Sequence, residues 1–158
     1  MKAIRFFHFL MKLFSSFFFV GLIPPMPGTY ASLLACLIYL ASGYLLYFEL
    51  IMGLGFFCLG LLTSRRAKEI WGSDDPSSVV IDEAAGMFLS LSFLPPSWLA
   101  VWLAFLLFRF FDITKIWGIR RLQAIPWSWG IMLDDLVAGL YTNLILQVVF
   151  RLILKSGV

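Results

Sequence analysis

The sequence contains few histidines and cysteines, the side chains that bind transition metals in many enzymes. It has one histidine, His8, and two cysteines, Cys36 and Cys58, in 158 residues. Both cysteines lie within apolar runs, so we expect small buried hydrophobic residues rather than a disulfide or a CxxC metal site. A zinc centre would need His or Cys ligands. The shortage excludes such a centre, and it excludes phosphatases that use a histidine nucleophile.

Motifs of several other phosphate-handling enzymes are absent as well. Arg65 follows Cys58 by seven residues, so there is no Cys-x5-Arg signature, and no D-x-D, H-E-x-x-H or GxxxxGK motif occurs. These absences exclude cysteine-dependent and haloacid-dehalogenase-type phosphatases, HExxH metalloproteases and P-loop proteins. No D-G-x-x-A-R block is found either, which argues against a phosphotransferase acting on CDP-lipids.

Charged residues are also scarce. They make up 13% of the chain, against 61% hydrophobic residues, and the mean hydropathy is +0.94. Soluble domains average about 25% charged and about 45–50% apolar residues. So little polar material cannot cover a soluble surface, and the composition predicts an integral membrane protein. The net charge of +3 without a dense basic run argues against nucleic acid as a partner, whereas anionic lipid headgroups fit.

Five apolar runs predict the helices of a membrane bundle. They cover residues 30–48, 50–63, 84–94, 97–108 and 136–154. A helix needs about 20 residues to cross a bilayer, so the first and last runs are long enough. The segment 136–154 is therefore the predicted last transmembrane helix.

Turns and charges predict the orientation of this bundle. Pro95 and Pro96 cannot continue a helix, so the runs on either side should form a short hairpin, and the first two runs should pair through a turn near Glu49. Ten basic residues then share one side, which the positive-inside rule assigns to the cytoplasm. They are Lys2, Arg5, Lys12, Arg65, Arg66, Lys68, Arg109, Lys115, Arg120 and Arg121, whereas Arg151 and Lys155 fall on the other side. The chain is predicted to be all-α, a polytopic bundle forming a single domain over 1–158, with its ionisable chemistry at the cytoplasmic face.

Two segments are predicted to lie along the membrane surface. In residues 3–20, Lys12 interrupts the apolar run and no cleavage site follows, so an interfacial helix is favoured over a signal peptide. Residues 113–129 combine Trp117, Trp127 and Trp129 with basic residues, a composition typical of the headgroup region.

Two pairs of adjacent carboxylates stand at the edges of apolar runs, Asp82-Glu83 and Asp134-Asp135. Helix capping and the helix dipole explain one acid at each place. They do not explain the second, because it repels its neighbour and charge at bilayer depth is costly. We favour a functional cluster over capping alone, and oxygen ligands without histidine indicate Mg²⁺, with Mn²⁺ as the alternative. The pattern D-x-x-x-G occurs at both pairs, either because the two helix starts are built alike or by coincidence.

Basic residues near a fifth acid suggest an anion site. Arg109, Asp112 and Lys115 are three residues apart, which places them on one helix face. Guanidinium and ammonium groups bind phosphate oxygens well, although an exposed, salt-bridged helix end would look the same. Gly28 and Thr29 follow three prolines, where backbone N–H groups can approach an anion, or where the chain only turns into the membrane.

Four motifs together resemble one known family. They are PGTYASL (27–33), VVIDEAAGMFLSL (79–91), FRFFDITK (108–115) and GIMLDDLVAG (130–139). In order and spacing they resemble the P-G-T-x-G-S-L, V-x-D-E-x-x-G, F-R-x-x-D-x-x-K-P and G-I-M-x-D-D-x-x-A-G blocks of the phosphatidylglycerophosphatase A family, over about residues 24–142. The resemblance implies a magnesium-dependent phosphatase of the bacterial inner membrane. Such an enzyme hydrolyses the phosphomonoester of phosphatidylglycerophosphate to phosphatidylglycerol and phosphate, and residues 1–23 would precede its core as the interfacial segment.

The residues that match the family's motifs can be given roles from their chemistry. The expected metal ligands are Asp82, Glu83, Asp134 and Asp135. The expected phosphate-binding residues are Gly28, Thr29, Arg109 and Lys115. Asp112 is expected to be a further ligand or the base, so that all five carboxylates count as catalytic. We expect an activated water as the nucleophile, with a covalent aspartyl-phosphate as the rival route.

The chain departs from the family pattern in three places. Ala31 replaces a glycine, and Ile116 and Gly118 replace two prolines. Trp127-Ser128 stands where the family has a glycine-rich segment before the G-I-M block. These changes leave the lipid specificity open. The alternatives are a retuned or inactive relative acting on another lipid phosphomonoester, and a non-enzymatic membrane scaffold or transporter. The expected partner is a phospholipid in the membrane, and no protein partner is implied.

Overall fold

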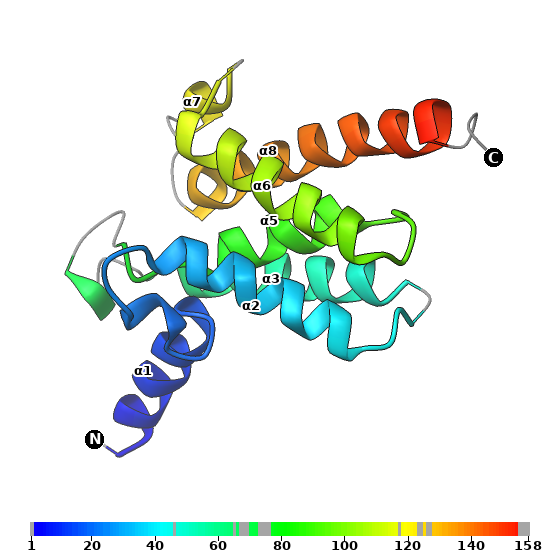
Figure 1. Cartoon of the computed structure of the whole chain (residues 1–158). Helices are drawn as coiled ribbons and strands as arrows, with labels where there is room; N and C mark the ends of the chain where they lie inside the picture. The colour runs from blue at the N-terminus through cyan, green and yellow to red at the C-terminus, as the bar shows by residue number, and fades with distance from the viewer. Residues whose placement is uncertain are drawn as a thin grey trace.

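The computed structural model describes residues 2–45, 47–64, 66, 70–72, 77–116, 118–122, 125 and 128–154. Within them all regular structure is helical, which confirms the all-α prediction (Figure 1). The α-helices are α1 (Lys2–Ser15), α2 (Pro27–Ala41), α3 (Phe48–Ser64), α5 (Ile81–Leu91), α6 (Trp98–Thr114), α7 (Ile119–Leu122) and α8 (Ser128–Val148). A 3-10 helix, η1 (Val20–Leu22), precedes α2, and a π-helical segment, η2 (Val149–Leu154), continues α8.

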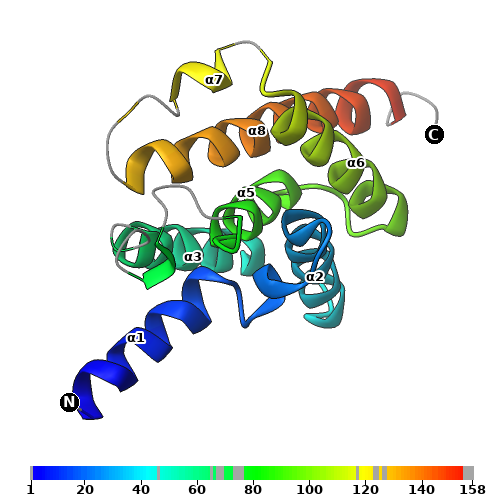
Figure 2. The same ribbon diagram turned by 90° about the vertical axis from the view of Figure 1, so that its left-hand side faces the viewer.

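The short helix α5 forms the centre of the bundle. Nine of its eleven residues are buried, and it packs against α2, α3, α6 and α8. Figures 1 and 2 show α2 and α3 on one side of α5 and α6 and α8 on the other. A helix that is apolar around most of its circumference has to be enclosed in this way. The ring of Phe88 stacks on Phe56 of α3, with 5.7 Å between centroids.

The predicted break at Pro95-Pro96 is confirmed. The helix α5 ends at Leu91, and α6 begins after Ser97, whose side chain caps α6 by accepting a hydrogen bond from the Ala100 N–H at 3.2 Å. The turn between α2 and α3 lies before Phe48 rather than at Glu49. Instead, Glu49 is buried in the first turn of α3, where its Oε1 accepts a hydrogen bond from the Phe93 N–H at 3.2 Å.

Two helices begin before the apolar runs that indicate them. The helix α2 starts at Pro27, directly before Gly28 and Thr29, and the proline ring fixes the φ angle that a first helical residue requires. The helix α8 starts at Ser128, eight residues before the predicted 136, so Asp134 and Asp135 lie inside the helix and not at its mouth. An apolar run marks only the hydrophobic part of a helix. A prediction based on it therefore omits helical turns whose polar side chains face the protein interior.

One described helix, Trp129–Arg151, is long and apolar enough to cross a membrane by length and composition. The other apolar helices, α2 and α3, are shorter. The expectation that both cysteines are buried is half wrong, because Cys36 is buried in α2 but Cys58 is exposed on α3.

Some sequence predictions fall outside the described residues. These are the placements of Arg65, Lys68, Trp117, Trp127 and Lys155, and the side chains of Arg120 and Arg121. Within the predicted surface segment 113–129, the short helix α7 is described.

Candidate active site at one end of the bundle

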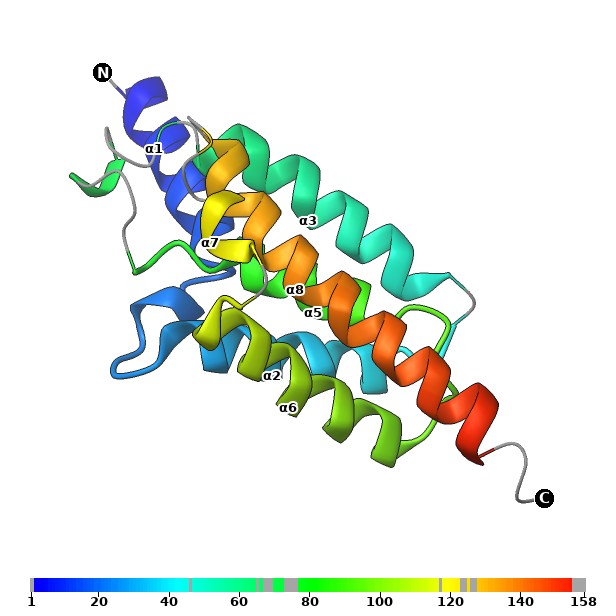
Figure 3. The ribbon, with the colours of Figure 1, turned by 90° about the horizontal axis from the view of Figure 1, so that it is seen from above.

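The residues predicted for the site come from four helices that meet at one end of the bundle. The helices α2 and α5 begin there, α6 ends there and α8 begins there (Figures 1 and 3). Every expected site residue lies within the first turns of α2, α5 or α8 or at the last turn of α6. The antiparallel α5–α6 hairpin is what returns Arg109 and Asp112 to the end where Asp82 and Glu83 stand.

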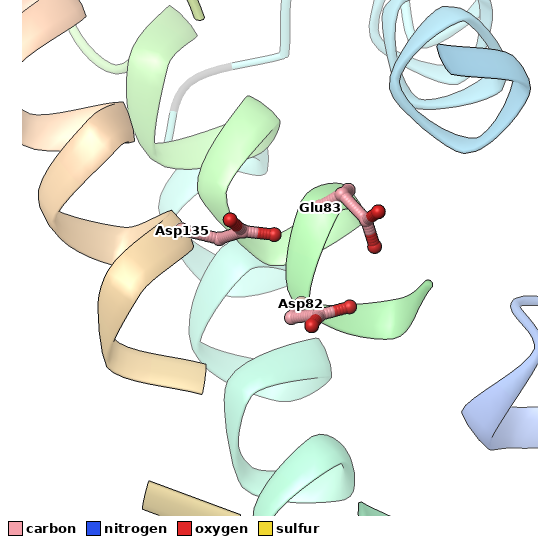
Figure 4. Close-up of side chains that lie close together, drawn as sticks. All are labelled: Asp82, Glu83 and Asp135. Carbon is pink, nitrogen blue, oxygen red and sulfur yellow. The ribbon is translucent and has the colours of Figure 1, made fainter. Parts of the chain in front are cut away.

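Three carboxylates converge where α5 meets α8. Asp82, Glu83 and Asp135 each place one oxygen within 4.8 Å of the other two, and Figure 4 shows Asp135 reaching from α8 toward the first turn of α5. Asp82 is 8% exposed and Asp135 is 3% exposed. Asp82 Oδ1, Glu83 Oε2 and Asp135 Oδ1 are buried and have no hydrogen-bond partner in the part of the chain that the structure describes. Buried carboxylate oxygens without partners are costly, so these residues fit a hard divalent cation bound through oxygen.

Asp134 takes a different position from its neighbour. Its carboxylate forms an ion pair and hydrogen bond with Lys115, and its Oδ1 accepts a hydrogen bond from the Asp135 N–H at 3.1 Å. Successive helix residues point about 100° apart, so only Asp135 faces α5. Asp134 lies beside the three converging carboxylates, and its expected role as a metal ligand stays a prediction.

Arg109, Asp112 and Lys115 form the charged face that their spacing predicted. Arg109 pairs with Asp112, and Lys115 Nζ lies 3.6 Å from Asp112 Oδ1 and 3.8 Å from Asp135 Oδ1. Asp112 is buried, so the alternative of an exposed salt-bridged helix end is wrong.

Lys115 is held in this cluster by an unusual backbone conformation. It closes α6 with φ 47° and ψ 46°, in the left-handed region, and its N–H donates to the Phe111 carbonyl at 2.8 Å. For a residue with a Cβ this conformation costs about 1–2 kcal/mol. Burial lowers the pKa of Lys115, but the carboxylates of Asp135, Asp134 and Asp112 outweigh it and raise the pKa above its ordinary value. The ammonium group is therefore charged at neutral pH.

The charges in this cluster do not balance. Five carboxylates, Asp82, Glu83, Asp112, Asp134 and Asp135, stand against two cations, Arg109 and Lys115. Buried charge without a counter-charge is strongly unfavourable. Divalent cations are often the largest local charge in such sites and would offset most of the excess.

The first turn of α2 closes the site from another direction. A Cβ on Gly28 would overlap Glu83 Oε1 and lie 3.2 Å from Arg109 Nη1, so a side chain at this position would displace the Glu83 carboxylate. Thr29 Oγ1 is buried without a hydrogen-bond partner, and the N-terminus of α2 has no side-chain cap. The N–H groups of Thr29 and Tyr30 donate to the Met26 carbonyl at 3.0 and 3.2 Å, and Pro27 has no N–H, which leaves the Gly28 N–H at this helix start. An N–H group there, next to a guanidinium, suits a phosphate oxygen.

A contact between two glycines sets the separation of α5 and α8, and sequence reasoning gave it no role. A Cβ on Gly86 would lie 2.5 Å from the Asp135 carbonyl oxygen, and one on Gly139 would overlap the Gly86 carbonyl. Each glycine follows its acid by four residues, Asp82 in α5 and Asp135 in α8. The repeated D-x-x-x-G was the available signal, because small residues one turn beyond each acid let the two helices touch.

The whole bundle core matches one family. The family model described as Phosphatidylglycerophosphatase A matches residues 13–150. The chain belongs to the phosphatidylglycerophosphatase A family. The match confirms the resemblance carried by the four motifs and extends it beyond residues 24–142 at both ends.

Relatives of the chain carry two kinds of name. Proteins named Phosphatidylglycerophosphatase A from Haemophilus influenzae and Escherichia coli K12 are 35% and 36% identical, covering 79% and 75% of this chain and 79% and 71% of their own length. A protein from Bacteroides thetaiotaomicron, provisionally named a phosphatidylinositol-3-phosphatase, is 34% identical over 89% of this chain and 93% of its own length. No solved structure matches the chain.

Proposed function

We propose that this chain is a magnesium-dependent lipid phosphatase that hydrolyses the phosphomonoester of phosphatidylglycerophosphate to phosphatidylglycerol and phosphate. The observation that carries the proposal is the convergence of Asp82, Glu83 and Asp135 within 4.8 Å of one another, beside two half-buried cations, Arg109 and Lys115. Membership of the family and the names of two relatives favour this substrate.

The residues present divide the chemistry between them. Asp82, Glu83 and Asp135, with Asp134 as a further candidate, would hold Mg²⁺ or Mn²⁺. When bound, such an ion supplies Lewis-acid polarisation of a phosphoryl oxygen and a more acidic water. Arg109 and Lys115 bind the phosphate oxygens and stabilise their charge as the ester bond breaks.

Two groups complete the phosphate pocket in this proposal. The Thr29 hydroxyl, which has no hydrogen-bond partner among the described residues, donates to a phosphate oxygen, and the Gly28 N–H does the same. Asp112, fixed by Arg109, is a further ligand or the base that orients the attacking water. If a carboxylate attacks instead, an aspartyl-phosphate forms and hydroxylamine will trap it.

We further propose that residues 1–158 form one polytopic domain of the bacterial inner membrane, with the site at the cytoplasmic face. Large apolar side chains are exposed on the outer helices, including Leu37, Ile51, Leu54, Trp102, Leu106 and Leu144. Such surfaces suit contact with lipid. Among the described cations, Arg109 and Lys115 lie at the site end and Arg151 follows the other end of α8, in agreement with the positive-inside rule. The acyl chains of the phospholipid then stay in the bilayer beside the helices.

The test is phosphate release by the purified protein in detergent. The substrates are phosphatidylglycerophosphate, phosphatidate, lysophosphatidate and phosphatidylinositol 3-phosphate, each with Mg²⁺, Mn²⁺ or EDTA. We expect the highest kcat/KM for phosphatidylglycerophosphate and complete loss with EDTA, restored by Mg²⁺. Because the Bacteroides relative covers most of this chain, phosphatidylinositol 3-phosphate is the second candidate, and a higher kcat/KM for it would replace the first. No release from any substrate would favour a scaffold, a transporter or an inactive relative.

A further inference from the structure

The C-terminal end of the N-terminal helix α1 is hydrogen-bonded to the bundle. The Ser15 carbonyl accepts a hydrogen bond from the Val80 N–H at 2.9 Å, and the Trp71 Nε1–H donates to Ser15 Oγ at 3.2 Å. Beyond this point α1 extends away from the other helices (Figures 1 and 2). Val80 directly precedes α5, so α1 is anchored two residues from Asp82, at the end of the bundle that carries the carboxylates.

The two faces of α1 differ sharply. At 100° per residue, Arg5, His8 and Lys12 lie on one face, and Phe7, Leu10 and Phe14 lie on the other. Toward the bundle, Leu10 and Phe14 are half-buried, whereas the residues of the free end are exposed. The apolar face that packs against the protein therefore continues beyond its edge, where Phe6 is 63% exposed.

The charge of α1 is of one sign. Residues 2–15 include Lys2, Arg5 and Lys12 and contain no Asp or Glu. Lys12 Nζ lies 5.0 Å from the ring centre of Trp71, and the Arg66 guanidinium lies 5.0 Å from that of Phe7. Cations alternating with aromatic rings along an amphipathic helix match the boundary between anionic headgroups and acyl chains.

We propose that α1 docks on an anionic phospholipid surface, in the leaflet that faces the active site. Its exposed phenylalanines enter the boundary between headgroups and acyl chains, and Lys2, Arg5 and Lys12 bind headgroup phosphates. Because Ser15 is tied to the residue before α5, docking holds Asp82 and Glu83 at headgroup depth. The proposal concerns a surface outside the catalytic cluster, and it holds whichever lipid phosphomonoester the site cleaves.

The test reads the position of α1 without any substrate. The full chain, with Cys36→Ala and Cys58→Ala, is placed in nanodiscs of phosphatidylcholine alone or mixed with phosphatidylglycerol. A single cysteine at Phe6→Cys, or at the matched control His8→Cys on the opposite face, carries an environment-sensitive fluorophore, and aqueous iodide is the quencher. In the anionic nanodiscs we expect the label at position 6 to be quenched several-fold less than the label at position 8.

Charge removal distinguishes electrostatic docking from simple burial. Each basic residue near an anionic surface contributes about 1 kcal/mol, so the triple variant Lys2→Gln, Arg5→Gln, Lys12→Gln should weaken docking about 100-fold. In this variant the protection at position 6 should disappear in anionic nanodiscs, while phosphate release in detergent is unchanged. Equal quenching at positions 6 and 8 in anionic membranes would overturn the proposal. Protection that persists in the triple variant, or that is the same in phosphatidylcholine alone, would overturn it too.

Discussion

At the scale of single residues, adjacent carboxylates have different surroundings. Asp135 turns toward Asp82 and Glu83 and its Oδ1 lies 3.8 Å from Lys115 Nζ without a hydrogen bond among the described residues, whereas Asp134 forms both an ion pair and a hydrogen bond with Lys115. The same change at each position should therefore have different effects, although the two residues are neighbours in sequence.

We expect Asp135→Asn to remove a metal ligand and Asp134→Asn to release Lys115. The first should lower kcat by about 10²–10³-fold, as removal of a stabilising group at a transition state does, and raise the Mg²⁺ concentration needed for half-maximal rate. The second should cost about 10–100-fold, as loss of an outer partner does, with little change in the Mg²⁺ requirement. Rates measured across a Mg²⁺ titration check this, with thermal unfolding in detergent as the control. Identical Mg²⁺ responses would contradict the assignment.

The environment of Lys115 predicts how the rate depends on pH. Its pKa in the folded protein is raised above the unfolded value of about 10.4, so its favourable charge interactions are fully present below that pH and are lost only as pH rises through the higher folded pKa. Lys115→Gln should therefore lower kcat/KM at every pH between neutrality and mild alkalinity without moving the alkaline limb of the profile. The prediction would be contradicted by an alkaline limb between neutral and mildly alkaline pH that is present in the parent and absent in Lys115→Gln. That result would show that the Lys115 ammonium group loses its proton in this range.

At the scale of helices, the crossing of α5 and α8 determines the distance between the ligands they carry. Gly86 and Gly139 touch at this crossing, and backbone atoms on either side cannot yield to a new methyl group. One turn away on each helix stands a carboxylate, so a wider crossing separates Asp82 from Asp135.

Gly139→Ala should thus lower both stability and activity. Overpacking costs about 1–3 kcal/mol, and a displacement of about 1 Å in a catalytic group can cost about 10²-fold in rate. Gly55→Ala in α3 is the matched control, because its new Cβ meets nothing within 4 Å. Melting temperature and phosphate release are measured for both variants. If Gly139→Ala behaves like Gly55→Ala, the crossing does not set the ligand distance.

At the scale of the whole molecule, the two ends of the bundle carry different kinds of polar group. One end holds the five carboxylates of the candidate site with Arg109 and Lys115. Toward the other end, neutral polar groups tie α8 to the end of α5. Asn143 Nδ2 donates to the carbonyls of Ser90 at 3.1 Å and Ser92 at 2.6 Å, and Gln147 Nε2 donates to Ser92 at 3.0 Å.

This division predicts that stability and activity can be separated. Asn143→Leu removes two hydrogen bonds to carbonyls at the C-terminal end of α5, so it should lower stability by about 1–2 kcal/mol, the scale of such bonds between membrane helices. The value of kcat should stay within a factor of about two of the parent, because the change lies more than two turns of α5 (each about 5.4 Å) from Asp82. Thermal unfolding and phosphate release in detergent measure the two effects. A large loss of kcat in an Asn143→Leu protein that is still fully folded would show that the two ends are coupled.

The sequence by itself determined the all-helical class, the break at Pro95-Pro96 and the family. Apolar runs and proline act locally, and a set of motifs in fixed order is a property of the chain. It also pointed to the acidic and basic residues of the candidate site, because charge in so apolar a chain is conspicuous.

Only the tertiary structure decided which of these groups meet. The direction of a side chain depends on where its helix begins and how that helix crosses its neighbour, so α8 starting at Ser128 is what turns Asp135 toward α5 and Asp134 toward Lys115. The packing of helices also brings Gly28 against Glu83. It brings Gly86 against Gly139 as well, which explains the repeated D-x-x-x-G. Contacts between helices distant in sequence are fixed by packing, which local pattern does not record.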